Sequence, residues 1–325
     1  MTKISLIYYD YSSFVRQDFD ILSRHFGVAK VNYRQAPDIF KILASIWQSD
    51  ISFSWFASGH SFAAILFSKL LDKRSIVIAG GYDVARVPEI NYGQFTQSWI
   101  RRFMTRFSLR HADLVLPVSE FAKKEVLRWE KPKKIQVIYN GIDINHFVAD
   151  GEKEELVITV GGVGWSNLKR KGLETFVKSA RLVPEARFVV IGKYKDDSIE
   201  CLKSIASSNV SFTDFVDSSD LLQWYQKAKV YVQISAYESF GMSLAEAMLC
   251  QCVPVVTDRG ALPEVVGDTG FYVPYGDEKA TAEGIKNALR SDRGAIARKR
   301  IEDMFSLRER EKGLMESIEK LYLSK

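Results

Sequence analysis

Short apolar runs alternate with amphipathic segments along the whole chain of 325 residues. In the first half, apolar runs predict strands at 4–9, 28–33, 51–55, 76–79, 114–117 and 135–139. The segments between them have helical periodicity and predict helices over 13–25, 60–71, 95–110 and 119–129. This alternation is typical of parallel α/β folds.

The second half repeats the scheme, with strands predicted at 156–161, 187–191, 210–212, 230–234 and 253–257. Its predicted helices cover 172–181, 219–227, 243–249 and 279–290. A chain of this length favours two domains. The boundary is expected in the turn that contains Asn140-Gly141, before the charged run 150–155. Near the end of the chain, Leu314, Ile318 and Leu321 form one apolar stripe of a helix.

Composition describes an ordinary globular protein, with 46% apolar and 26% charged residues. The N-terminus begins as a strand and resembles no signal peptide, and no apolar stretch reaches the roughly 18 residues that would span a membrane. Cys201, Cys250 and Cys252 lack zinc-site spacing. We expect buried thiols in a reducing cytosol, and hence a cytoplasmic protein.

Positive charge is concentrated in one segment. Residues 1–150 carry 20 Lys and Arg against 14 Asp and Glu, a balance of +6, and residues 99–134 hold 10 basic and 4 acidic residues, which accounts for all of it. Arginines and aromatics alternate there: Trp99, Arg101, Arg102, Phe103, Arg106, Phe107 and Arg110. Such a helix could contact an anionic membrane. The alternative is a solvated basic face backed by an ordinary core stripe. Nucleic acid fits poorly, because no known binding module accompanies the patch.

Candidate chemistry centres on the segment 238–248, E-S-F-G-M-S-L-A-E-A-M, which follows a predicted strand. Gly241 suits the turn, and a helix is expected to start near Met242 or Ser243. The first N–H groups of a helix form an anion site. Glu238 and Glu246 flank that site, an arrangement that suits a ligand with both phosphate and hydroxyl groups, such as a nucleotide sugar. Alternatively, Ser243 and Glu246 form a capping box and Glu238 is a solvated loop residue.

This segment, together with Pro254-Val255-Val256, the G-A-L-P-E-V-V at 260–266 and the G-F-Y-V-P at 270–274, resembles the signature region of retaining GT-B glycosyltransferases of the family 4 / group 1 type. The resemblance implies an α/β fold with two Rossmann-like domains facing across a cleft. Residues 1–145 would hold the acceptor, and a C-terminal helix at 306–325 would cross back to them. Residues 146–305 would bind the donor.

The resemblance also implies roles for individual residues. Glu246 would bind the ribose and Glu238 the transferred sugar, near the loop residues Ser239, Phe240, Gly241 and Met242. A Lys before a Gly opens a helix and reaches the donor diphosphate in this family, and Lys171-Gly172 matches. The family commonly has an Arg directly after the glycine of the strand, but here Gly162 and Val163 occupy that place, and the loop through Trp165 and Asn167 looks enlarged. Gly162 is still assigned to the donor site. Arg170 would substitute. From the residues alone, the run Lys169-Arg170-Lys171 at a helix start is unfavourable without an anion; a solvated basic face is the alternative.

In the first half, Asp83 follows a buried strand and two glycines, where sites of open α/β sheets lie. It matches loosely a family position that faces sugar or acceptor, and we assign it a catalytic role beside Glu238 and Lys171; a turn-forming Asp is the alternative. For His60, capping or a core role is preferred. The family's glycine-rich loop after the first strand is replaced by Tyr9-Asp10-Tyr11-Ser12-Ser13.

Together these features predict a retaining hexosyltransferase that uses a nucleoside diphosphate sugar and a glycan or lipid-linked acceptor. No metal or other cofactor is expected, because the four histidines are scattered and no Asp-x-Asp motif stands at the diphosphate position. Lys171, Arg170 and the helix N-terminus would neutralise the leaving group. Two alternatives remain open: an epimerase or phosphorylase of the same fold, and an inactive partner subunit that binds the nucleotide sugar. We expect a cytoplasmic enzyme with peripheral contact to the inner face of the membrane through 99–134.

Overall fold

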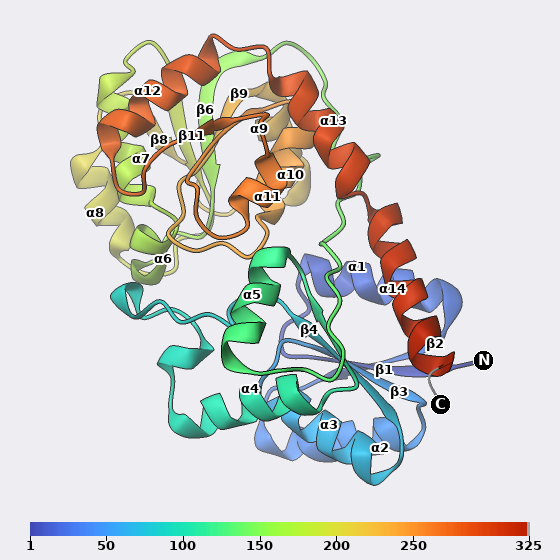
Figure 1. Cartoon of the computed structure of the whole chain (residues 1–325). Helices are drawn as coiled ribbons and strands as arrows, with labels where there is room; N and C mark the ends of the chain where they lie inside the picture. Colours follow the sequence, from blue (N-terminus) through green and yellow to red (C-terminus); the bar gives the residue numbers. More distant parts are fainter. Residues whose placement is uncertain (324–325) are drawn as a thin grey trace. The chain divides into compact units, whose positions relative to one another are not determined.

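The computed structural model describes residues 1–323, and these form two compact units. Unit 1 comprises Met1–Gly141 together with the chain from Arg308 onward, and unit 2 comprises Ile142–Leu307. The observed division therefore falls after residue 141, four residues before the expected one. Each unit is built on one parallel sheet (Figure 1).

The sheet of unit 1 has the strand order β2-β1-β3-β4-β5. Its strands are β1 Lys3–Tyr8, β2 Gly27–Asn32, β3 Ile51–Trp55, β4 Arg74–Ala79 and β5 Leu114–Pro117. The predicted strand at 135–139 is wrong, because only a single bridge joins Ile135 to Val115. Pro117 accepts a bond from the Ile138 N–H but has no N–H of its own, so the ladder cannot continue.

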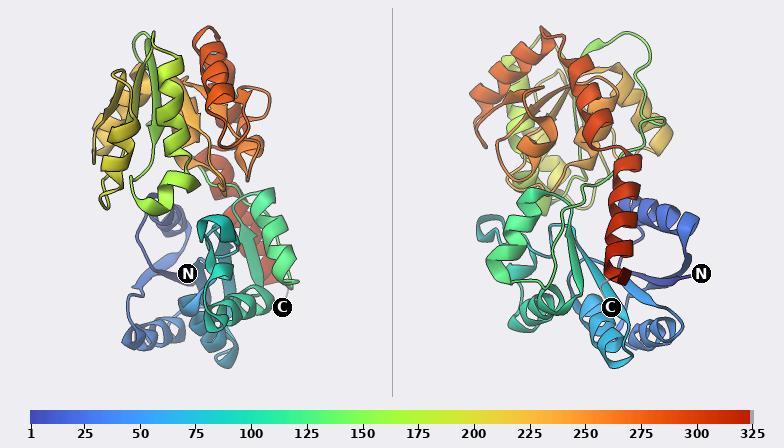
Figure 2. Two further views of the ribbon diagram at one scale, coloured as in Figure 1. Left: turned by 90° about the vertical axis from the view of Figure 1, so that its left-hand side faces the viewer. Right: turned by 45° about the vertical axis from the view of Figure 1, so that its right-hand side comes forward.

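Helices cover both faces of this sheet. They are α1 Ser13–His25, α2 Ile39–Trp47, α3 Gly59–Leu70, α4 Trp99–His111, α5 Glu120–Trp129 and the terminal α14 Leu307–Leu323, with short 3-10 turns at Ala36–Asp38, Pro88–Ile90 and Gln94–Thr96. The helices α2, α3 and α4 form one layer, and α1 lies with α14 on the opposite face (Figures 1 and 2). This arrangement follows from the strand order, because the chain moves from β1 to β2 in one direction across the sheet and from β2 through β3 and β4 to β5 in the other. Right-handed crossovers in opposite directions place their helices on opposite faces.

A buried ion pair fastens α14 to unit 1. The Arg310 guanidinium donates to both carboxylate oxygens of Asp18 on α1, at 2.6 and 2.7 Å, and their side chains are only 2% and 0% exposed. The Trp55 indole N–H donates to the same carboxylate at 2.9 Å. The predicted apolar stripe of α14, including Leu314, is buried beside it. The expected return of the C-terminal helix to the first domain is therefore confirmed.

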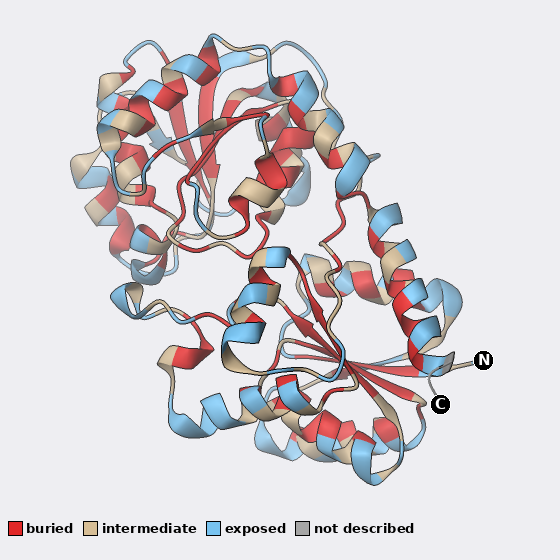
Figure 3. Cartoon of the chain, viewed as in Figure 1, coloured by how far each residue is buried: buried red, intermediate tan, exposed pale blue. Residues whose placement is uncertain are grey.

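Unit 2 has the strand order β11-β10-β9-β6-β7-β8. Its strands are β6 Glu154–Val160, β7 Arg187–Ile191, β8 Val210–Phe212, β9 Ala228–Gln233, β10 Val253–Val256 and β11 Phe271–Tyr272. Its helices are α6 Trp165–Arg170, α7 Leu173–Ser179, α8 Ser198–Ile205, α9 Ser218–Lys227, α10 Met242–Leu249, α11 Leu262–Val266, α12 Glu278–Leu289 and α13 Gly294–Met304, with a 3-10 turn at Ala180–Leu182. The central strands are buried on both faces (Figure 3). Side chains that face solvent near the sheet are therefore confined to the strand ends.

Candidate functional site

The loop from β9 into α10 has the geometry of an anion site. Gly241 is the N-cap of α10 and adopts a φ of +99°, which a side chain would strain. The helix therefore begins at Met242, as predicted. Its first N–H groups have no acceptor within the helix and carry the positive end of the helix dipole. Because Gly241 is the cap, Ser243 is already inside the helix, and the capping-box interpretation of Ser243 and Glu246 is wrong.

Three polar side chains meet at the carboxyl ends of β6 and β9. The Lys171 ammonium and the Gln233 amide both donate to one carboxylate oxygen of Glu238, each at 2.8 Å. The side chains of Lys171 and Glu238 are each 16% exposed. Burial alone would raise the pKa of the Glu238 carboxyl, but the positive charges of Lys171 and Arg170 hold it below its usual value. Glu238 is therefore a charged group in this cluster, not a solvated loop residue.

Lys171 is held in place by the chain on either side of it. Gly172 has a φ of +69°, and a Cβ at that position would lie 2.4 Å from the backbone oxygen of Ile234. Only glycine allows so close an approach to the loop that carries Glu238. The Arg170 carbonyl also accepts a bond from the Ala236 N–H at 2.8 Å. The two loops are thus joined on both sides of the Lys171–Glu238 pair.

The enlarged loop expected around Trp165 and Asn167 is instead the short helix α6. Lys169 and Arg170 lie in its last turn, where the helix dipole favours cations. The argument that these two cations stand at a helix start is therefore wrong. Arg170 donates to Asn167, whose amide in turn donates to the Gly162 carbonyl at 2.7 Å. A polar chain thus links the glycine after β6 to Arg170.

Glu246 lies just over one turn into α10. Its carboxylate accepts a hydrogen bond from the Tyr225 hydroxyl at 3.1 Å. Burial raises the pKa of Glu246 to about 7, although the bond from Tyr225 lowers it. Burial raises the pKa of the Tyr231 hydroxyl, and the nearby carboxylates of Glu246 and Glu238 raise it further. Glu246, one of the expected donor-binding residues, therefore lies beside the Lys171–Glu238–Gln233 cluster, but its hydrogen bond is to Tyr225.

Sequence reasoning missed Gln233, Tyr225 and Tyr231. Gln233 is the last residue of β9, and a polar side chain at the carboxyl end of an otherwise buried strand was the available signal. Tyr225 and Tyr231 gave no such signal, because tyrosine is common in buried elements. Ser239 and Phe240 complete the loop, and both are buried.

Replacement of Glu246 by Gln should raise the stability of the folded protein at pH 8 and should change that stability little at pH 5. The folded-state pKa of Glu246 is about 7, above the ordinary value of a Glu. The folded protein therefore holds this proton more tightly, and stability is lost as pH rises toward 7. A glutamine at this position does not titrate, so the variant does not lose this part of its stability as pH rises. Thermal unfolding at both pH values tests this, with the exposed Glu152→Gln as control. An equal change at both pH values would contradict the raised pKa.

Asp83 belongs to unit 1 and is 1% exposed. Its two carboxylate oxygens accept backbone N–H bonds from Ala57 at 2.8 Å and Gly81 at 2.7 Å. Burial raises its pKa to about 6 despite these bonds. Asp83 thus ties together the loops after β3 and β4, and this geometry leaves no exposed oxygen for a substrate. Its catalytic role stays a prediction that this arrangement does not favour.

His60 is likewise in the core of unit 1, as preferred from the sequence. Its ring nitrogens bond the Trp55 carbonyl at 2.7 Å and the Ser58 hydroxyl at 2.8 Å. Burial lowers its pKa to about 4, so the ring is neutral. Among residues 1–323, no group of three His, Cys, Asp or Glu side chains is placed to hold a metal ion.

Known proteins resemble this chain in sequence and in fold. The sequence is 28% identical to the O-antigen chain mannosyltransferase RfbU of Salmonella typhimurium over 200 residues, 59% of this chain and 56% of the relative. It is 24% identical over 210 residues to an N-acetylgalactosaminyltransferase of Campylobacter jejuni that is named for a diphospho-undecaprenol acceptor, covering 60% of this chain and 56% of the relative. The chain thus spans just over half the length of these relatives.

The structure of the Anabaena protein HepE in complex with UDP and glucose superimposes with a TM-score of 0.83 at 17% identity, covering 98% of this chain and 100% of that one. This likeness establishes the two-domain GT-B fold. The sequence model described as "Glycosyltransferase Family 4" matches residues 16–146, and the one described as "Glycosyl transferases group 1" matches residues 154–291. The two models together account for most of both units, and the chain belongs to the GT-B glycosyltransferases of the family 4 / group 1 type.

Proposed function

We propose that this protein is a retaining hexosyltransferase that transfers a sugar from a nucleoside diphosphate to a glycan or lipid-linked acceptor, without a metal. The observation that supports this most directly is the Lys171–Glu238–Gln233 cluster beside the N-terminus of α10. A cation, a carboxylate and an anion-binding helix start are the groups that a diphosphate joined to a hydroxyl-rich sugar requires. Membership of the family supports the same assignment.

In this proposal the donor diphosphate lies against Lys171 and the start of α10. Arg170 supplies a second positive charge from the end of α6. The N–H groups of Gly241 and Met242 face the phosphate and the sugar, Glu238 accepts sugar hydroxyls, and Glu246 accepts the ribose hydroxyls. Glu238 accepts a bond from Lys171, so a bound diphosphate would share that cation.

The chemical step breaks the bond between the anomeric carbon and the diphosphate oxygen. The acceptor hydroxyl attacks from the face that the diphosphate leaves, and the departing phosphate takes the acceptor proton. Positioning and stabilisation of the negative charge on the diphosphate then supply most of the rate enhancement. No side chain needs to form a covalent intermediate in this scheme.

Release of nucleoside diphosphate from UDP-, GDP- and ADP-hexoses, with and without a glycan acceptor, tests the proposal. We expect release with one base and dependence on Glu246, since Glu246→Gln removes the charge that binds the ribose. Nucleotide binding without release from any of the donors would instead favour an inactive binding partner. A thermal-shift screen of UDP, GDP and ADP identifies the base beforehand, because a ligand at about a hundred times its Kd adds about 2.7 kcal/mol.

We place the acceptor on unit 1 and the protein in the cytoplasm, in peripheral contact with the membrane through 99–134. The name of the Campylobacter relative supports a lipid-linked acceptor, which would be held at a membrane surface. No helix within residues 1–323 is both long and apolar enough to cross a bilayer. The proposed contact uses the segment 99–134, which belongs to unit 1.

A further inference from the structure

The helix α4 packs Leu109 into the core of unit 1 but leaves large aromatic side chains in solvent. Thr105 and Ser108 face the interior and are fully buried, whereas Trp99 and Phe103 are 69% and 55% exposed. The buried hydroxyls are satisfied, since Thr105 donates to the Ala57 carbonyl and Ser108 to the Met104 carbonyl, both at 2.9 Å. The interpretation that the aromatics of this helix form a core stripe is therefore wrong for Trp99 and Phe103. A soluble helix gains nothing from exposing these rings to water.

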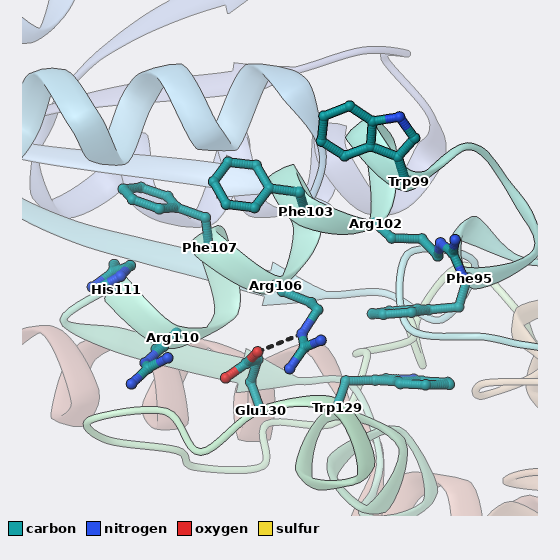
Figure 4. Close-up of a pocket in the computed structure, with 10 residues that line it drawn as sticks. All are labelled: Phe95, Trp99, Arg102, Phe103, Arg106, Phe107, Arg110, His111, Trp129 and Glu130. Carbon is teal, nitrogen blue, oxygen red and sulfur yellow. Dashed lines mark hydrogen bonds and ion pairs between the residues drawn. The ribbon is translucent and has the colours of Figure 1, made fainter.

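Beside the exposed rings runs a row of arginines. Arg102, Arg106 and Arg110 recur every four residues, so they lie on one side of the helix. They line a groove of about 440 Å³ between α4 and the end of α5 (Figure 4). The floor of the groove includes Phe95 and Trp129, whose rings stack in parallel with centroids 3.9 Å apart. Cationic side chains therefore border an aromatic surface.

The exposed apolar surface continues across the neighbouring helices. Apolar side chains on the same α2–α3–α4 layer are also exposed: Phe40, Trp47, Leu66, Leu70 and Ile100. Two lysines accompany them, Lys41 on α2, which is paired with Asp38 at 2.7 Å, and Lys69 on α3. The opposite face of the sheet is covered by α1 and α14 (Figures 1 and 2). The layer is therefore an apolar and basic face of unit 1, which we call the α2–α4 face.

We propose that the α2–α4 face lies on an anionic phospholipid membrane, with the rings of Trp99 and Phe103 in the interface and the arginine row on lipid phosphates. This inference specifies the membrane partner within the proposed function and rests on it. Free phosphate would use the arginines but would leave the exposed rings unexplained. A lipid surface uses both, because amphipathic surfaces bind by burying apolar area and by attraction to anionic headgroups.

One acidic side chain opposes this attraction. Glu130, after α5, lies in the groove and bonds Arg106 at 2.6 Å, and its side chain is only 11% exposed. It neutralises the middle member of the arginine row. Removal of its charge should therefore strengthen the attraction to an anionic surface, whereas removal of arginines should weaken it. A purely structural role for these residues would not give effects of opposite sign.

Co-sedimentation with phosphatidylglycerol/phosphatidylcholine vesicles and with pure phosphatidylcholine vesicles tests the proposal on the full chain. We expect binding to the anionic vesicles only, and its loss at high salt, where exposed charges are screened. Replacement of Arg102, Arg106 and Arg110 by Gln should weaken binding on the order of a hundredfold, from about fivefold for each charge. Glu130→Gln should strengthen it severalfold. Trp99→Ala and Trp47→Ala should each weaken it.

Matched controls lie in unit 2. Phe215 is 70% exposed, and Phe215→Ala should leave vesicle binding unchanged. Replacement of Arg181, Arg187 and Lys299 by Gln removes the same net charge from exposed positions and should have little effect. Nucleotide thermal shifts on all variants show whether the donor site is intact, so that failure of the proposed function is seen separately.

Equal binding to both vesicle types, or an equal loss in the unit 2 controls, would overturn the proposal. So would competition by inorganic pyrophosphate together with no effect of Trp99→Ala, which would indicate a soluble anion site. A third outcome would also overturn it: the protein does not bind vesicles but forms dimers, and Trp99→Ala dissociates these dimers. That result would show that the α2–α4 face joins two copies of the chain.

Discussion

Replacement of Lys171 by Ala should lower the affinity for the nucleoside diphosphate about 10- to 150-fold and leave the affinity for the nucleoside nearly unchanged. The factor corresponds to the loss of one charged hydrogen bond, about 1.5–3 kcal/mol. Lys171 lies 2.8 Å from Glu238, and its only expected ligand contact is with phosphate. Titration calorimetry with the two ligands measures the difference.

The same substitution also removes the cation that holds the pKa of Glu238 below its usual value. The folding stability of Lys171→Ala should therefore fall together with its diphosphate affinity, and a second variant is needed to distinguish the two effects. The double variant Lys171→Ala/Glu238→Gln no longer buries an unpaired carboxylate, so it should regain stability without regaining diphosphate affinity. Equal loss of nucleoside and diphosphate affinity in the single variant would make Lys171 a structural residue.

Replacement of Arg310 by Met should reduce the free energy of unfolding by about 3–5 kcal/mol, because the Asp18 carboxylate would remain buried without its cation. Both partners of this pair are almost completely buried. Urea unfolding followed by tryptophan fluorescence measures the change, and Trp55 bonded to Asp18 is a natural reporter.

Two comparisons isolate the ion pair in this prediction. Asp18→Leu/Arg310→Met removes both charges and should recover much of the loss, since well-packed apolar residues often replace a buried pair at little cost. Arg24→Met breaks an exposed ion pair between α1 and Glu311, which is on α14 like Arg310. This change should cost less than about 1 kcal/mol. A similar loss in Arg24→Met and Arg310→Met would show that burial of the pair is not what matters.

The sequence predicted most of the sheets because their central strands are continuous apolar runs. The strands β3, β5, β7 and β8 have the predicted bounds. The helix α2, Ile39–Trp47, was missed although Ile39, Ile42 and Ile46 recur at helical spacing. The helix α6 was missed because Gly164 and Asn167 resemble a loop, whereas Gly164 is its N-cap. Such short elements are fixed by tertiary contacts rather than by local pattern.

At the candidate site, spacing and family resemblance led to Glu238 and Lys171, which the structure joins in one ion pair. The spacing and the resemblance could not indicate that Gln233 also bonds Glu238, since that contact depends on where β9 ends. Nor could they show that Trp99 faces solvent. A periodic pattern gives the angle between side chains on a helix but not which side turns inward. Here the inward side carries Leu109, which packs in the core, and Thr105, which bonds the Ala57 carbonyl.

The attachment of α14 to unit 1 has a consequence for biosynthesis. On the ribosome, residues 1–141 emerge first, but the arginine that neutralises Asp18 is synthesised only after all of unit 2. Unit 2, which is continuous in sequence, can therefore complete its fold while the N-terminal part still lacks its last helix. Nascent chains usually mature from the N-terminus onward. Here the first domain to be made would be the last to be finished, and chains truncated before Arg310 should be selectively exposed to proteolysis in unit 1.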